Sequence, residues 1–149
     1  MNLRAGVMLT SLQHDGSIFD DALLYLVAYD ESGAVGVIVN KPYGRALNEL
    51  HEFRHSPSWP LYNGGPVAHE ELFFLHRRPD LIADGASAGD GLQWGGRFSD
   101  AVRGINNGAL TTADVKLFVG YCGWDAGDLE AEVASGAWQL SEANGNTIF

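Results

Sequence analysis

Cysteine, long apolar runs and positive charge are all scarce in this sequence, and each shortage excludes a class of protein. The single cysteine among 149 residues, Cys122, leaves no partner for an intrachain disulfide, which indicates a reducing compartment. No apolar run approaches the roughly 20 residues that a membrane-spanning helix needs. The opening stretch, MNLRAGVMLTSLQHDG, lacks the long apolar segment of a secretory signal peptide. We therefore expect a cytoplasmic protein with no membrane association.

The shortage of positive charge bears on nucleic acid as a partner. Nine Lys and Arg residues stand against 19 Asp and Glu, so the formal net charge is -10. Such a surface repels a phosphate backbone. The only adjacent basic pair, Arg77-Arg78, is followed closely by Asp80, and no helix-turn-helix pattern with a basic recognition helix is present. The charge pattern therefore predicts no direct binding to DNA.

The residues that are abundant indicate one globular domain. Apolar residues make up 46% of the chain and charged residues 19%, and no linker, repeat or low-complexity tract divides it. The 19 glycines predict many tight turns and close backbone approaches. We expect a single domain over residues 1–149.

The predicted strands and helices are mixed without regularly repeated βαβ units, which predicts an α+β fold. The clearest signal is a hairpin, because residues 22–30 and 34–40 are apolar at nearly every position and flank a tight turn. Further strands are expected at 5–12, 61–67, 71–77 and 114–122, and closing strands at Trp138 and Ile148-Phe149. Helices are expected at 45–53, at 100–107 with Ser99 as its cap, and at 126–135 with Asp125 as its cap.

Residues 51–55, HEFRH, match the H-E-x-x-H motif of zinc hydrolases. On a helix, two histidines four residues apart can share a zinc ion while the glutamate acts as general base. Pro57 follows closely and ends a helix at or before Ser56. We interpret the motif as an accidental match at a polar helix end, and a zinc site at His51 and His55 remains an alternative. The candidates for a third ligand are His69, Glu70 and Glu71.

Residues 85–89, GASAG, match G-x-S-x-G, the nucleophile elbow of α/β-hydrolases. That elbow joins a strand to a helix and needs a histidine later in the chain. No histidine follows His76, and Gly89-Asp90-Gly91 is a poor helix start. We interpret the segment as a loop of small residues.

Cys122 lies in Gly120-Tyr121-Cys122-Gly123-Trp124, near the start of the last predicted helix. A helix N-terminus can favour a thiolate, but the nearby acids oppose one. A buried and unreactive thiol is the favoured interpretation. An enzyme that uses Cys122 as a redox or nucleophilic thiol remains the alternative.

The stretches GAVGVIVNKP (33–42), YNGGPV (62–67) and GYCGWDAGDLEAEVASGAW (120–138) resemble the YqgE/AlgH family of bacterial proteins in order and spacing. The resemblance implies an α+β fold with a bifurcated, largely antiparallel sheet that forms a pseudo-barrel, with a few short helices packed on it. Members are described as transcriptional regulators, without an established biochemical activity or cofactor. The family usually has Ser or Ala at the position of Cys122, so the resemblance does not support thiol chemistry.

The resemblance and the charge together predict a non-enzymatic protein that acts through a protein or small-molecule partner, without a cofactor or metal. Two interpretations of the shared motifs stay open. The glycines, prolines and tryptophans can be purely structural, or Asn40, the GGP turn and the GYCGW turn can meet at one rim that holds a polar ligand. The candidate binding residues are Asn40, Gly64, Gly65, Pro66, Tyr121, Cys122 and Trp124.

Overall fold

The structure is a computed structural model that describes residues 2–143 and 148–149. Over these residues the chain forms strands, two α-helices and two 3-10 turns, which confirms the predicted α+β class. Among them no helix is both long and apolar enough to cross a bilayer. The elements are β1 Val7–Ser11, β2 Leu23–Asp30, β3 Gly33–Ile38, β4 Pro42–Ala46, η1 Leu47–Glu49, η2 His51–Phe53, β5 Pro60–Asn63, β6 Val67–His76, β7 Ala86–Ser87, β8 Gln93–Trp94, α1 Phe98–Asn106, β9 Val115–Asp125, α2 Asp128–Ala134 and β10 Trp138–Glu142.

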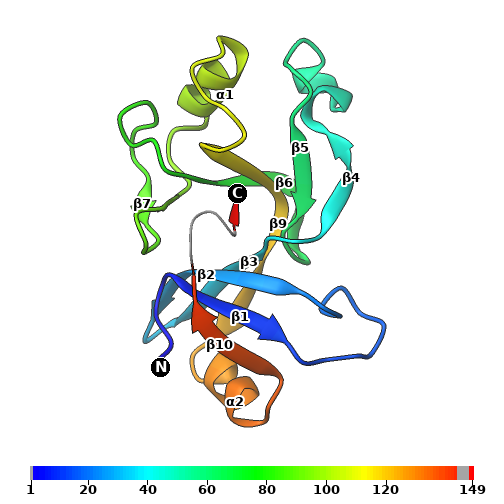
Figure 1. Cartoon of the computed structure of the whole chain (residues 1–149), viewed down its shortest axis with the longest axis vertical. Helices are drawn as coiled ribbons and strands as arrows, with labels where there is room; N and C mark the ends of the chain where they lie inside the picture. The colour runs from blue at the N-terminus through cyan, green and yellow to red at the C-terminus, as the bar shows by residue number, and fades with distance from the viewer. Residues whose placement is uncertain (1, 144–147) are drawn as a thin grey trace.

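Strand β9 joins the two parts of the sheet. Its first seven residues, up to Tyr121, pair with β6, and the next four, from Cys122, pair with β3. The strand order over the described residues is β10-β1-β2-β3-β9-β6-β8-β7, and β5 also pairs with β9, in parallel. Figure 1 shows β9 passing from the part with β4, β5 and β6 to the part with β1, β2, β3 and β10. The sheet is thus largely antiparallel and divides at β9, but it is not closed into the barrel that the resemblance implied.

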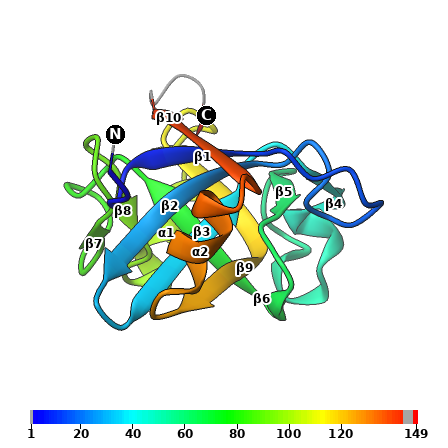
Figure 2. The same ribbon diagram turned by 90° about the horizontal axis from the view of Figure 1, so that it is seen from below.

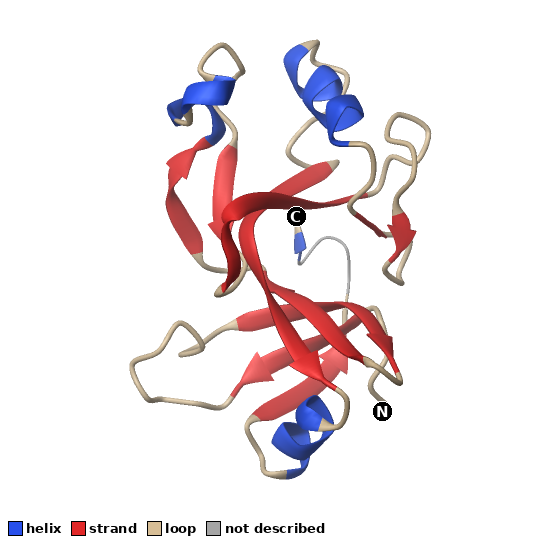
Figure 3. Ribbon diagram, turned by 180° about the vertical axis from the view of Figure 1, so that it is seen from behind, coloured by secondary structure: helices blue, strands red, loops and turns tan. Residues whose placement is uncertain are grey.

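Within the described part of the chain the core consists of three apolar clusters, one on each outer side of the divided sheet and one between its parts. Ile105 of α1 packs with Leu117 and other residues of the β6 part. Leu129 of α2 packs with the β1–β3 part. Tyr25 and Phe118 belong to the cluster that fills the space between the two parts. The two α-helices consequently lie at opposite ends of the molecule (Figure 3), and α2 lies against the strands of its own part (Figure 2).

The predicted hairpin is confirmed as the antiparallel pair β2–β3. Consecutive residues Leu24, Tyr25 and Leu26 are fully buried, because one face of β2 packs on the α2 side and the other faces the central cluster. The Asp30 carboxylate accepts a hydrogen bond from the Ser32 N–H at 2.8 Å and closes the turn. Burial of both faces explains why this pair has the strongest sequence signal.

The helix expected over 45–53 is wrong. The chain continues β4 to Ala46 and then makes two separate 3-10 turns, η1 and η2. Leu50 lies between the turns in extended backbone, with φ -84° and ψ 135°, which interrupts any helix. The Leu47 N–H donates to the Trp59 carbonyl at 2.8 Å, so a contact with a distant segment replaces the helical hydrogen bond.

Four other local expectations are corrected. The N-caps of α1 and α2 are Arg97 and Gly127, not Ser99 and Asp125, since neither predicted cap stands at a helix boundary. The segment GYCGW is not a turn, because it continues β9. The closing strand at Trp138 is confirmed as β10. The one expected at 148–149 is wrong for its two residues, where Ile148 is buried in the central cluster outside any strand.

Candidate functional site

The GGP turn, Gly64-Gly65-Pro66, crosses β9 near the point where that strand changes its partner from β6 to β3. The Gly64 N–H donates to the Val119 carbonyl at 2.9 Å, and the Gly64 carbonyl accepts from the Ile38 N–H at 3.0 Å. A Cβ at Gly64 would lie 2.4 Å from the Gly120 carbonyl oxygen, and one at Gly65 would lie 2.3 Å from that of Tyr121. These approaches are too close for any side chain, so both glycines are required by the backbone crossing itself.

A pocket of about 380 Å³ opens beside this crossing, and we call it the motif pocket. Five segments that are distant in sequence form it: the loop before β2, the start of β6, the end of β9, helix α2 and the start of β10. Its lining residues are Gln13, Phe19, Pro66, Val67, Cys122, Gly123, Trp124, Asp125, Asp128, Glu132 and Trp138.

Three aromatic side chains make one corner of the motif pocket. Trp138 is 3% exposed, and its ring meets those of Phe19 and Trp124 edge to face, at centroid distances of 5.9 and 6.2 Å. The Trp138 indole N–H donates to a carboxylate oxygen of Glu132 at 3.0 Å. That hydrogen bond and the perpendicular packing fix the orientation of the corner, as aromatic pairs prefer.

Carboxylates line the motif pocket beside this aromatic corner. Asp125 and Asp128 are exposed, and Glu132 is half-buried. Asp128 and Glu132 stand four residues apart, so they share one face of α2. No Lys or Arg occurs among the described residues that line this pocket. An apolar corner beside uncompensated negative charge favours a cationic group with an apolar body.

The thiol of Cys122 is an inert part of the wall. Cys122 is 2% exposed, and its Sγ donates to the Gly64 carbonyl oxygen at 3.5 Å. Burial raises the pKa of this thiol to about 12, because the apolar surroundings penalise the thiolate. The group is therefore protonated at neutral pH, and the thiolate that nucleophilic or redox chemistry needs is disfavoured.

The seven candidate residues from the sequence are only partly brought together. Pro66, Cys122 and Trp124 line the motif pocket, and Gly64 and Gly65 form the crossing beside it. Asn40 and Tyr121 are not among the lining residues.

Asn40 and Tyr121 have other contacts. The Asn40 Oδ1 accepts from the Leu23 N–H at 2.8 Å, and its Nδ2 donates to the Asp21 carbonyl at 2.9 Å, so the side chain ties down the start of β2. Tyr121 packs against Phe73, with the ring centroids 5.1 Å apart, in the central cluster. The single rim that was expected to include Asn40 is thus not formed.

Several lining residues were not predicted as site residues. Trp138 was expected in a closing strand, Asp125 as a helix cap, and the acids near Cys122 as charges that oppose a thiolate. The available signals were the i, i+4 spacing of Asp128 and Glu132, and the place of Trp138 at the end of the 120–138 stretch that resembles the family. Nothing in the local sequence indicates that Phe19 meets Trp138, because that contact depends on the pairing of β1 with β10.

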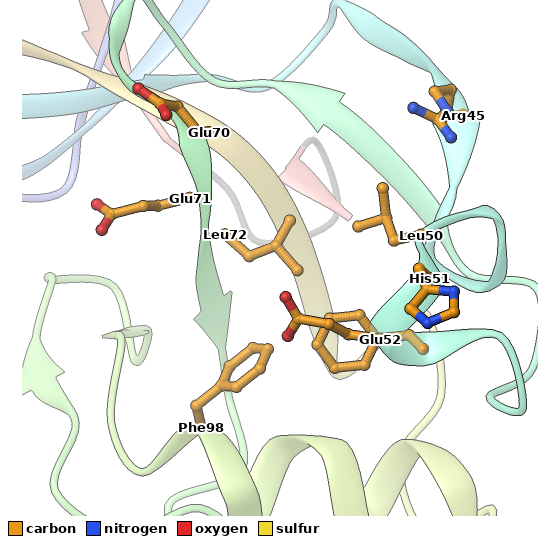
Figure 4. Close-up of a pocket in the computed structure, with 9 residues that line it drawn as sticks. Arg45, Leu50, His51, Glu52, Glu70, Glu71, Leu72 and Phe98 are labelled. Carbon is orange, nitrogen blue, oxygen red and sulfur yellow. The ribbon is translucent and has the colours of Figure 1, made fainter.

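His51, Glu52 and Phe53 of the HEFRH motif line a second hollow, of about 510 Å³, between η2 and β6 (Figure 4). These three residues form a 3-10 turn and His55 lies beyond it, so the two histidines do not stack as they would on an α-helix. His69 instead pairs with the Asn63 side chain at 2.9 Å. Within residues 2–143 and 148–149, no group of three or more His, Cys, Asp and Glu side chains is arranged to hold a metal ion.

The G-x-S-x-G segment also lacks the geometry of an elbow. Ser87 lies in the two-residue strand β7, which pairs with β8. The next residues form the turn to β8 rather than a helix. The Ala88 and Gly89 carbonyls accept hydrogen bonds from the Tyr25 hydroxyl, at 2.7 and 3.0 Å. The segment therefore anchors a loop to β2.

Comparison with known proteins gives one consistent result. Residues 7–149 match the family described as AlgH-like. The chain is 35% identical over 133 residues to a UPF0301 protein of Chlorobium phaeobacteroides, covering 89% of this chain and 71% of that protein. It is 33% identical over 148 residues to one from Chlorobaculum parvum, covering 99% and 79%.

Two solved structures share the fold. The solution structure of the AlgH protein from Pseudomonas aeruginosa superposes with a TM-score of 0.79 at 28% identity, covering 97% of this chain and 80% of that one. A crystal structure of a Corynebacterium diphtheriae protein gives 0.75 at 15% identity, covering 99% and 80%, and that likeness concerns the fold alone.

Proposed function

This chain belongs to the AlgH-like family, a family of uncharacterised proteins, and from that premise we propose that it is a non-enzymatic, cytoplasmic regulatory protein whose motif pocket binds a small organic cation. The ligand class is a protonated or quaternary amine with an apolar body. A single observation carries the proposal, namely that the aromatic corner of Phe19, Trp124 and Trp138 lies beside carboxylates, with no basic residue among the described residues that line the pocket. Aromatic faces and carboxylates both attract an organic cation, and neither attracts an anion.

The size and the fixed wall of the motif pocket support a small ligand. A volume of about 380 Å³ falls in the range of small-molecule sites. The wall is preorganised, because the glycine crossing and the Trp138–Glu132 hydrogen bond hold it without a ligand. A preformed wall reduces the ordering that binding requires.

Two other functions have weaker support. Burial and a raised pKa disfavour Cys122 as the nucleophile of an enzyme. The net charge of -10 opposes a regulator that contacts DNA directly. Regulation through a bound ligand or protein partner is consistent with both features.

The test is a titration with matched alkyl ligands. A primary alkylamine, its trimethylated form, the corresponding alcohol and the corresponding carboxylate are compared by calorimetry and by tryptophan fluorescence. We expect the two cations to bind and the alcohol and carboxylate to bind at least tenfold more weakly. Equal binding of the amine and the alcohol, or no binding of any cation at millimolar concentration, would overturn the proposal.

Variants assign the binding to this pocket. Trp124→Ala removes one aromatic wall and is expected to weaken cation binding about 3- to 30-fold. Asp128→Asn tests the charge of the carboxylate side. Asp90→Asn is the matched control, because Asp90 is an exposed acid in the β7–β8 loop and does not line the motif pocket. A control variant that loses as much affinity as Asp128→Asn would indicate non-specific charge attraction.

A further inference from the structure

The second hollow, which we call the η2 groove, is lined by residues farther along β6 than the motif pocket. Its lining residues come from β4, from the 3-10 turn η2 and the residue before it, from β6 and from the start of α1. They are Arg45, Leu50, His51, Glu52, Phe53, Glu70, Glu71, Leu72 and Phe98. Only Val67, at the first position of β6, lines the motif pocket, while residues 70–72 of the same strand line the groove. The two hollows are therefore separate but share one strand.

A bulge in β6 places acidic side chains at the groove. Val67 pairs with Tyr121 and Leu72 pairs with Val119, so residues 68–71 all lie opposite Gly120. Ala68 adopts a left-handed conformation, with φ 49°, which allows the chain to leave the ladder. The extra residues cannot pair with β9, and Glu70 and Glu71 are exposed as a result.

The floor of the η2 groove is apolar and partly open to solvent. Leu50, Phe53, Leu72 and Phe98 are each half-buried. The rings of Phe53 and Phe98 meet edge to face, with centroids 5.8 Å apart. Figure 4 shows Leu50, Leu72 and Phe98 directed into one space from three different elements. An open apolar patch inside a polar rim has the anatomy of a protein-binding surface.

The rim of the η2 groove carries uncompensated negative charge. Among the described residues, Glu52, Glu70 and Glu71 take part in none of the ion pairs. The one guanidinium of the rim, on Arg45, donates to the Glu49 backbone carbonyl at 3.1 Å rather than to a carboxylate. Among the residues that line the groove, three carboxylates thus stand against one arginine.

We propose that the η2 groove docks a segment of a partner protein that presents Lys or Arg beside a large apolar side chain. The apolar side chain fills the floor, and the basic group meets Glu70 and Glu71. Charge decides between this occupant and a second copy of the chain, because two surfaces from a protein of net charge -10 repel one another. The groove is a different site from the motif pocket, so this proposal does not depend on the ligand proposed there.

The probe is a fluorescently labelled, amidated hexapeptide, Gly-Arg-Leu-Phe-Lys-Gly, followed by anisotropy with the full chain. Two further peptides serve as controls: one with Glu in place of Arg and Lys, and one with Ala in place of Leu and Phe. We expect saturable binding of the first peptide, and at least tenfold weaker binding of the other two. Equal binding of the alanine peptide would show that the apolar floor is not used and would overturn the proposal.

Charge-matched double variants locate the binding. Glu70→Gln with Glu71→Gln removes two exposed acids of the groove and is expected to weaken the peptide about tenfold. Asp125→Asn with Asp128→Asn changes the net charge equally at the motif pocket and is expected to leave peptide affinity within twofold. If both double variants weaken peptide binding equally, the interaction is general charge attraction, and the assignment of the peptide to the η2 groove is refuted.

Self-association is measured on the same samples by analytical ultracentrifugation. If the chain forms a dimer and Glu70→Gln with Glu71→Gln dissociates it, a second copy fills the groove. That result would overturn the proposal that a different protein binds there. A saturating alkylamine that leaves the labelled peptide bound would confirm that the two sites are independent. A failure of amine binding then refutes only the proposed function, while a failure of peptide binding refutes only the docking groove.

Discussion

Replacing Gly65 with alanine tests whether the GGP turn exists for the backbone crossing. Gly65 has φ 151°, and an added Cβ would lie 2.3 Å from both the carbonyl carbon and oxygen of Tyr121 and 2.7 Å from the Cys122 nitrogen. All three atoms belong to the backbone of β9, so no side-chain rotation relieves the clash. Either the turn or β9 must move.

The expected loss of stability follows from two effects. A left-handed backbone conformation in a non-glycine residue costs about 1–3 kcal/mol. Overpacking against a wall that cannot yield costs about 1–3 kcal/mol more. Gly65→Ala should therefore lower the free energy of unfolding by about 2–6 kcal/mol, which for a chain of this size lowers Tm by about 4–24 °C.

Gly123→Ala is the matched control, since it makes the same chemical change in the segment that Gly65 contacts. Its Cβ would meet only the Tyr121 ring, at 3.6 Å, and Gly123 has no positive φ. We expect a change below about 1 kcal/mol. The assay is equilibrium urea unfolding followed by tryptophan fluorescence. Similar losses in both variants, or a loss under about 0.5 kcal/mol in Gly65→Ala, would refute a steric origin for this motif.

Two further predictions concern candidate residues that the structure places in supporting roles. Because burial raises the pKa of the Cys122 thiol from 9.0 to about 12, its stabilising contribution is complete below pH 9 and is lost as the pH rises toward 12. The difference in free energy of unfolding between wild type and Cys122→Ala should be constant from pH 6 to about 8 and shrink above about 9. Iodoacetamide should label the thiol more slowly in the native protein than in the denatured one, and faster native labelling would contradict the prediction. Asn40→Ala removes the two hydrogen bonds that hold the start of β2 and should lower the free energy of unfolding by about 1 kcal/mol without changing amine binding. A loss of amine affinity with unchanged stability in that variant would indicate that Asn40 belongs to the binding site.

Local pattern predicted the elements that are buried on both faces or have one clear apolar stripe. The β2–β3 hairpin and helix α1 lie within two residues of their expected bounds, because continuous apolar runs and a helical period are local signals. The helix predicted over 45–53 does not form, because Leu50 has an extended backbone and the Leu47 N–H donates a non-local hydrogen bond to the Trp59 carbonyl. Tertiary context outweighs a weak helical period of this kind.

Within β9, one residue departs from the alternation of faces that is usual in a strand. Strict alternation predicts that Tyr121 shares a face with Val115, Leu117 and Val119. Gly120 has φ 75°, which interrupts the alternation, and Tyr121 instead joins the central cluster with Phe118. A glycine in a strand can mark such an irregularity, but the sequence does not state which of several glycines has a positive φ.

By itself the sequence determined the α+β class, the absence of an intrachain disulfide, the negative charge and the family. These properties depend on composition, on local periodicity or on the order of short motifs. Only the tertiary structure decided where the candidate sites lie. The motif pocket combines residues from Gln13 to Trp138, and the η2 groove combines residues from Arg45 to Phe98. Both depend on β9 changing partner and on the bulge in β6, and strand pairing between distant segments leaves no mark in the sequence of either strand alone.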